Sequence, residues 1–149
     1  MSGIVVGVDG SPGSKRALEW AAAEARVRQL PLTLVHAWYP PFSAYGGIGW
    51  AGADAQAISS LEELANDRLA AIRDEASAAL EGLEVETVVV EGLAARTLLD
   101  AAADADLLVV GTRGHGGFVG LLLGSVSQEC AHHSRCPIVI VPSATPDKG

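Results

Sequence analysis

The residues best suited to chemistry lie in one stretch rich in glycine and serine near the end of the sequence. Gly111-Thr112-Arg113-Gly114 is followed, after nine residues, by Gly124-Ser125-Val126-Ser127. Glycine lets a backbone approach an anion closely and adopt positive φ. N–H groups at a helix start, aided by the helix dipole, attract phosphate, and Ser125 and Ser127 add hydroxyl donors. The stretch therefore predicts two phosphate contacts, a turn after one strand and the start of the next helix.

One carboxylate, Asp9, is the second candidate for chemistry. It follows the short apolar run that begins at Ile4 and precedes the turn Gly10-Ser11-Pro12-Gly13. Two roles remain open for it: a hydrogen bond to ribose hydroxyls at the end of a strand, or an N-cap for the helix that follows. We favour the nucleotide role, because Asp9 follows the carboxyl end of a predicted strand, where open α/β sheets bind ligands.

The elements that must position these residues alternate along the chain. Strands are predicted at 4–9, 31–37, 85–90, 106–111 and 137–141, and helices at 14–29, 59–80, 94–103 and 125–134. The strands are nearly continuous apolar runs, as expected for a parallel sheet covered on both faces by crossover helices. The sequence predicts a three-layer α/β/α fold with a five-stranded parallel sheet.

One segment, 38–58, is rich in glycine, proline and aromatic residues and has no regular period. Connections this long are often functional or mobile, so it is interpreted either as a surface excursion or as a lid over a site. No repeat or second core is apparent, and residues 1–149 are expected to form a single nucleotide-binding domain.

Composition excludes several classes of protein. The formal charge of −8 and the scattered basic residues argue against nucleic-acid binding, which needs a basic surface. No apolar run reaches the roughly 18 residues that predict a membrane span, and no signal-peptide pattern is seen, so a cytoplasmic location is expected. Cys130, His132, His133 and Cys136 lack the spacing of a zinc site, and no metal ligands are assigned.

Other nucleotide-binding and catalytic motifs are also absent from the sequence. No lysine follows the glycines as in a P-loop, and the turn after Asp9 lacks the G-x-G-x-x-G of dinucleotide-binding folds. The G-x-S-x-G turn of hydrolases is missing as well.

The run GTRGHGGFVGLLLGSVSQECAHHSRCPIVIV resembles the universal stress protein family, in the subgroup that binds ATP. The segments IVVGVDGSPGSKRAL, LTLVHAW and DLLVVGTRG extend the resemblance over the chain. The resemblance implies a Rossmann-like fold of the adenine nucleotide alpha hydrolase-like type, with strand order 3-2-1-4-5. It also implies ATP bound between the ends of the first and fourth strands, and a homodimer formed through the last strand, Pro137–Val141.

The resemblance also implies a role for individual residues. The acidic position that contacts the nucleoside corresponds to Asp9, and the position whose backbone reads the adenine edge corresponds to Ala37. The remaining contacts, in the adenosine pocket and the two phosphate-binding segments, are Gly7, Val8, Val110, Gly111, Arg113, Gly114, Gly124, Ser125, Val126 and Ser127. Mg²⁺ is expected to be bound through the phosphates.

Two functions from different classes follow. The first is a cytoplasmic, homodimeric, ATP-binding module that regulates a stress response; the alternative is a slow ATP hydrolase or phosphotransferase. Hydrolysis needs a general base near the γ-phosphate. Arg113 and His115 are the candidates for that place, and neither is an obvious base for water, so we assign no catalytic residue and favour binding.

Overall fold

Five parallel strands form the centre of the computed structural model, which describes residues 3–39, 55–112 and 124–142. The strands are β1 (Ile4–Gly7), β2 (Leu32–Trp38), β3 (Val85–Glu91), β4 (Leu107–Gly111) and β5 (Ile138–Val141). Their order across the sheet is β3-β2-β1-β4-β5, and every neighbouring pair is parallel. The predicted sheet and its strand order are confirmed.

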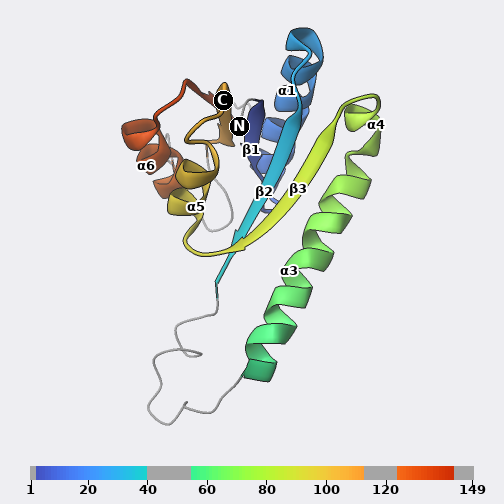
Figure 1. The fold of residues 1–149 in the computed structure, drawn as a ribbon, viewed down its shortest axis with the longest axis vertical. Helices are drawn as coiled ribbons and strands as arrows, with labels where there is room; N and C mark the ends of the chain where they lie inside the picture. Colours follow the sequence, from blue (N-terminus) through green and yellow to red (C-terminus); the bar gives the residue numbers. More distant parts are fainter. Residues whose placement is uncertain (1–2, 40–54, 113–123, 143–149) are drawn as a thin grey trace, which may run out of the picture.

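Helices cover both faces of this sheet (Figure 1). One face carries α1 (Pro12–Arg28), α3 (Ala55–Glu75) and the short α4 (Ser77–Leu80), and the other carries α5 (Ala94–Ala101) and α6 (Ser125–His133). Each face has its own cluster of buried side chains, so the predicted three layers are present.

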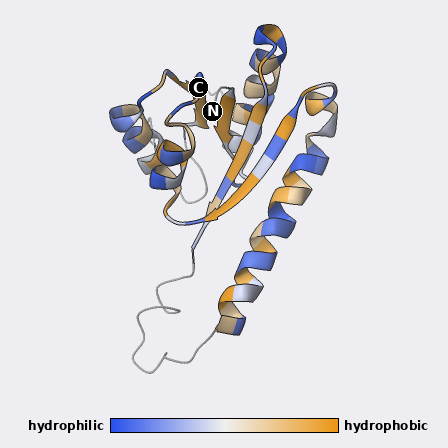
Figure 2. Cartoon of the chain, viewed as in Figure 1, coloured by the Kyte–Doolittle hydropathy of each residue, from blue (hydrophilic) through white to orange (hydrophobic). Residues whose placement is uncertain are grey.

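Alternation along the strands divides the apolar side chains between these two clusters. In β1, Ile4 and Val6 face α1 while Val5 faces α5, as the two-residue period of a strand requires. The inner side of α1 is built of alanines, which are at most 1% exposed and let the helix axis lie close to the sheet. Figure 2 shows the mainly hydrophobic strands beside α3, which carries hydrophilic residues along much of its length.

The predicted helix 59–80 differs from the observed helices at its start and in its continuity, whereas its predicted end at Leu80 is confirmed by α4. α3 already begins at Ala55, and the helical run is interrupted at Ala76, whose N–H is shared between the carbonyls of Ile72 and Arg73. Leu64, expected on the buried face, is 54% exposed. The buried face of α3 is thus narrower than its apolar pattern indicates.

The bounds predicted for the long connection 38–58 are wrong at both ends. Trp38 belongs to β2, and residues 55–58 form the first turn of α3. Its other residues, apart from Tyr39, lie outside the described part of the chain. The interpretation of this segment as a lid concerns those residues. No helix among the described residues is long and apolar enough to cross a membrane.

Candidate functional site

The candidate site lies where the carboxyl ends of β1 and β4 meet. The two strands are neighbours at the middle of the sheet, with Val6 in register with Val109. After β1 the chain crosses to α1 on one face, and the helix that follows β4, α6, lies on the other. This divergence creates the topological switch point at which open α/β sheets bind ligands. Gly7, Val8, Val110 and Gly111, which the resemblance assigns to the nucleotide, all lie at this point, although β1 ends at Gly7 and not at the predicted Asp9.

Gly111 has a packing reason to be glycine. A Cβ there would lie 2.8 Å from the carbonyl oxygen of Gly13, in the first turn of α1. At Gly7 the contact is with a side chain and not with backbone, since a Cβ there would lie 2.7 Å from Cδ1 of Leu98. Neither residue has positive φ. The conformational freedom expected from glycine is therefore not what Gly111 supplies; it supplies close approach between β4 and α1.

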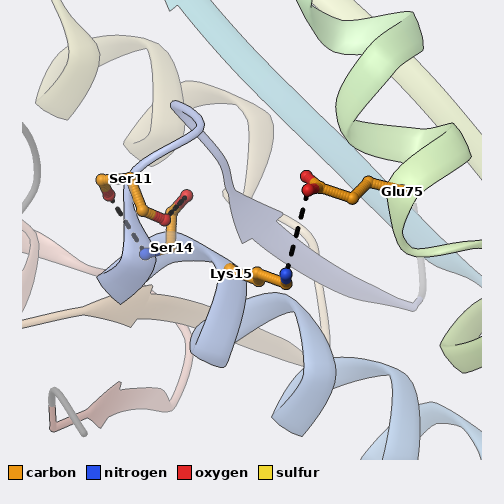
Figure 3. Close-up of polar contacts among 4 residues, drawn as sticks. All are labelled: Ser11, Ser14, Lys15 and Glu75. Carbon is orange, nitrogen blue, oxygen red and sulfur yellow. Dashed lines mark hydrogen bonds and ion pairs between the residues drawn. The ribbon is translucent and has the colours of Figure 1, made fainter.

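Asp9 is held at the corner between β1 and α1. Its Oδ1 accepts a hydrogen bond of 2.9 Å from the N–H of Ser11, and its own N–H donates to Oγ of Ser14 at 3.2 Å. The N-cap of α1 is Ser11, whose Oγ accepts from the N–H of Ser14 (Figure 3). The capping role left open for Asp9 thus belongs to Ser11, and the half-buried carboxylate of Asp9 organises the turn before the helix.

The first turn of α1 has a further contact with α3. Nζ of Lys15 lies 3.9 Å from a carboxylate oxygen of Glu75, and both side chains are more than half exposed (Figure 3). An exposed ion pair of this kind contributes little to stability. The corner therefore depends on the hydrogen bonds of Asp9, Ser11 and Ser14.

The start of α6 offers an anion-binding surface. Gly124 is its N-cap, with φ −77° and ψ 174°, and no side chain of the described chain caps the helix. The first turn contains no acidic residue. The first N–H groups of a helix have no partner within it and carry partial positive charge. The exposed Ser125 and half-buried Val126 belong to this turn, so the predicted helix start is present.

Thr112 joins this helix start to the end of β4. Its carbonyl accepts from the N–H of Gly124 at 2.6 Å and from Oγ of Ser127 at 2.9 Å, and its N–H donates to the carbonyl of Val141 at 3.1 Å. Oγ of Ser127 also lies 3.1 Å from the carbonyl of Gly124. The single hydroxyl proton of this buried serine is therefore already shared between two backbone carbonyls.

Two predicted phosphate contacts, Arg113 and Gly114, lie outside the described residues. Ala37 lies in β2, in register with Val90 of β3 and just beyond the end of β1. The carboxyl ends of β1, β2 and β4 thus gather Gly7, Val8, Asp9, Ala37, Val110 and Gly111 along one stretch of the sheet edge, with Gly124 tied to β4 through Thr112.

The sequence analysis missed His36, which is 7% exposed and whose Nδ1 lies 2.9 Å from the carbonyl oxygen of Val8. Because a carbonyl can only accept, Nδ1 carries the proton and donates it. The signal was available: His36 is the one ionisable residue in the apolar run 31–38. The capping role of Ser11 was also detectable, since serine followed by proline is a common way to start a helix.

The cysteines are not part of this site. Burial, assisted by the nearby charge of Glu129, raises the pKa of the Cys130 thiol from its ordinary 9.0 to about 11. Cys136 is half-buried beside Oγ of Ser134. Within the described ranges, no group of three or more His, Cys, Asp or Glu side chains is arranged to hold a metal ion.

Comparison with known proteins adds to this geometry. The model of the universal stress protein family matches residues 1–142. The chain belongs to this family. A universal stress protein of Mycobacterium tuberculosis is 37% identical over 146 residues, which are 93% of this chain and 47% of the relative; one from Mycolicibacterium smegmatis is 35% identical, with the same shares. The chain thus spans about half the length of the curated relatives it matches.

Solved structures support the same family. A universal stress protein in complex with cAMP is 29% identical, with a TM-score of 0.71 and coverage of 97% of this chain and 98% of that one. A universal stress protein from Archaeoglobus fulgidus in complex with dAMP is 26% identical, with a TM-score of 0.60 and coverage of 95% of this chain and 98% of that one. Structural relatives of this family member therefore bind adenine nucleotides.

Proposed function

We propose that this domain binds ATP at the switch point between β1 and β4 and acts as a nucleotide-dependent regulatory module in the cytoplasm. The observation that carries the proposal is the start of α6, which has no side-chain cap within the described chain and is tied by Thr112 to the end of β4. A helix start of this kind attracts phosphate. The adenine nucleotides in the related complexes favour the same ligand class.

The proposed orientation follows from the two halves of the site. The phosphates lie against the first turn of α6, near Gly111, with Arg113 and Gly114 as further contacts. The nucleoside lies over β1 and β2, with Asp9 directed at the ribose and Ala37 at the base. Mg²⁺ is bound through the phosphate oxygens, which are the ligands it prefers.

Binding is favoured over hydrolysis. Among the described residues, Asp9 and His36 are titratable groups beside the end of β1, and both bond to backbone groups of the β1–α1 corner. Each is thus engaged on the nucleoside side of the proposed site, away from the start of α6. A general base for hydrolysis must come within hydrogen-bond reach of the attacking water, or reach it through one further water. Asp9 and His36 lie on the other side of the proposed site, so neither is assigned that role.

The test places a negative charge at the N-cap of α6. Gly124 has the extended backbone that N-cap residues adopt. Gly124→Asp is therefore expected to retain the helix and to raise the stability of the protein by ~0.3 kcal/mol. The same carboxylate repels phosphate and occupies the N–H groups, so the affinity for Mg-ATP is expected to fall by about tenfold or more, ~1.4 kcal/mol. Isothermal titration calorimetry measures the affinity, and thermal unfolding measures the stability.

Gly124→Asn is the matched control, since asparagine caps a helix equally well without a charge. It is expected to weaken binding less than Gly124→Asp does. Unchanged Mg-ATP affinity in the aspartate variant would contradict a phosphate site at α6. Loss of both affinity and stability would assign the effect to the fold instead.

We also propose that the protein forms a homodimer through the strand Pro137–Val141. β5 is at the edge of the sheet, and Ile138, Val139 and Ile140 are each half-buried within one chain. Exposed apolar edge strands are usually paired or covered. The carbonyls of Pro137 and Val141 accept from β4, so Ile138 and Ile140 direct their backbone groups outward, toward a partner strand.

A further inference from the structure

The backbone of β2 alternates between its two neighbours. The N–H of Leu32 donates to the carbonyl of Glu84 before β3, and the carbonyl of Trp38 accepts from Gly92 after β3. The carbonyl of Val35 instead accepts from the N–H of Val8, at 3.0 Å, beside β1. Since both backbone groups of one residue in a parallel ladder face the same neighbour, those of Ala37 must face the β1 side.

The hydrogen bond that would continue this ladder joins the N–H of Ala37 to the carbonyl of Val8. That bond is not formed in the described chain: the register of β1 with β2 ends at Gly7 and Val35. The carbonyl of Val8 accepts from Nδ1 of His36 instead, at 2.9 Å. The imidazole thus lies at the carbonyl to which the N–H of Ala37 would donate if the ladder continued.

His36 is well suited to this task because it is buried. Its side chain is 7% exposed, and its position two residues after Leu34 places it on the face covered by α1 and α3. A buried donor holds its acceptor firmly, since neither group can exchange its partner for water without cost. In the described part of the chain, the backbone groups of Ala37 are left facing the space beyond the end of β1.

We infer that His36 is a positioning residue which, by bonding the Val8 carbonyl, ends the β1–β2 ladder one step early and leaves the Ala37 N–H and C=O open to read the base. The inference rests on the proposed function. Adenine presents an amino donor beside a ring-nitrogen acceptor, which matches one N–H and one C=O on the same side of a strand. Guanine presents a carbonyl oxygen in place of the amino group, so it would meet the C=O of Ala37 with an acceptor.

Two variants separate this role from simple packing. His36→Leu introduces an apolar side chain of similar size and removes the donor, so the Val8 carbonyl is expected to accept from the N–H of Ala37. His36→Asn is the matched control, because its side-chain amide nitrogen is attached to Cγ as Nδ1 is and retains a donor for Val8. Both are prepared as the full chain, with far-UV circular dichroism as the check of folding.

The first measurement needs no nucleotide. Amide hydrogen exchange by NMR is expected to show Ala37 exchanging at least about tenfold faster than Val35 in the wild type and in His36→Asn, since Val35 is inside the paired part of the sheet. In His36→Leu the Ala37 amide is expected to become protected. Because the wild-type comparison uses no variant, it tests the inference even where the leucine substitution prevents folding.

The second measurement compares ATP with GTP by calorimetry. The wild type and His36→Asn are expected to prefer ATP, and His36→Leu is expected to lose about tenfold in ATP affinity and most of that preference. An Ala37 amide as protected as that of Val35 in the nucleotide-free wild type would overturn the inference, as would an unchanged ATP preference in His36→Leu. A wild type that binds neither nucleotide would refute the proposed function itself, and with it the base-reading role.

Discussion

Replacing Ser127 by alanine separates the motif-based reading of the phosphate site from the observed geometry. The sequence motif predicts that the Ser127 hydroxyl donates to a phosphate. In the structure Ser127 is 2% exposed, and its hydroxyl lies 2.9 Å from the carbonyl oxygen of Thr112 and 3.1 Å from that of Gly124. The prediction is therefore that Ser127→Ala affects stability more than it affects nucleotide affinity.

The size of the stability effect follows from the partners that remain. Without the hydroxyl, the Thr112 carbonyl still accepts from the N–H of Gly124 at 2.6 Å, and the Gly124 carbonyl from the N–H of Gln128 at 3.0 Å. No buried acceptor is orphaned, so the cost is that of one ordinary hydrogen bond, ~0.5–1.5 kcal/mol. For a chain of this length each kcal/mol corresponds to roughly 2–4 °C in the melting temperature.

The assay pairs Ser127→Ala with Ser125→Ala. Ser125 is the exposed first residue of α6. A hydroxyl bound to a charged phosphate contributes ~1.5–3 kcal/mol, about tenfold or more in affinity. We expect Ser127→Ala to lower the melting temperature by a few degrees and the Mg-ATP affinity by less than about threefold. Ser125→Ala is expected to do the reverse, with near-normal melting and about tenfold weaker binding.

Differential scanning fluorimetry and titration calorimetry on the same preparations give both quantities. A tenfold loss of affinity in Ser127→Ala with an unchanged melting temperature would refute the reasoning. The loss of affinity would mean that the hydroxyl leaves Thr112 and Gly124 and bonds the phosphate when nucleotide binds. The unchanged melting temperature would mean that its bonds to those two carbonyls contribute nothing to the stability of the fold.

Two further predictions concern Cys130 and the edge of the sheet. Because the folded-state pKa of Cys130 is raised from 9.0 to about 11, the unfolded chain releases this proton first, so its contribution to stability is complete below pH 9 and is lost as the pH rises through 11. Urea unfolding should show this decline in the wild type and a shallower one in Cys130→Ala. At the edge, Ile140→Pro removes an N–H that faces away from β4, so sedimentation should show a folded monomer at the micromolar concentration at which the wild type is a dimer. A monomeric wild type would contradict the proposed dimer.

The fold was largely predictable because its strands are nearly pure apolar runs separated by helical patterns. The break at Ala76 was not, since the surrounding residues DEASAAL are mostly good helix formers and contain neither glycine nor proline. The exposure of Leu64 was also hidden. Periodicity indicates which side of a helix is apolar, but the sheet beneath determines how much of that side is covered.

The candidate site was predicted in its place and less well in its detail. The residue types and their spacing identified Asp9, Gly111 and Gly124 as candidates at strand ends and at a helix start. The topology of the sheet then brings those positions to one edge. Hydrogen bonds between residues far apart in the sequence, such as the one from His36 to Val8, depend on strand register. The patterns of a single sequence do not allow that register to be inferred.

The close approach of Gly111 to Gly13 has a consequence for interpreting related sequences. With 2.8 Å between a Cβ at position 111 and the Gly13 carbonyl oxygen, selection for folding alone would retain glycine there, whether or not a descendant still bound a nucleotide. Gly124 differs, because its φ of −77° is open to every residue type. As homologues diverge, the appearance of aspartate or glutamate at position 124 would therefore mark the loss of the ligand, whereas glycine at position 111 would persist in members that bind nucleotide and in members that do not.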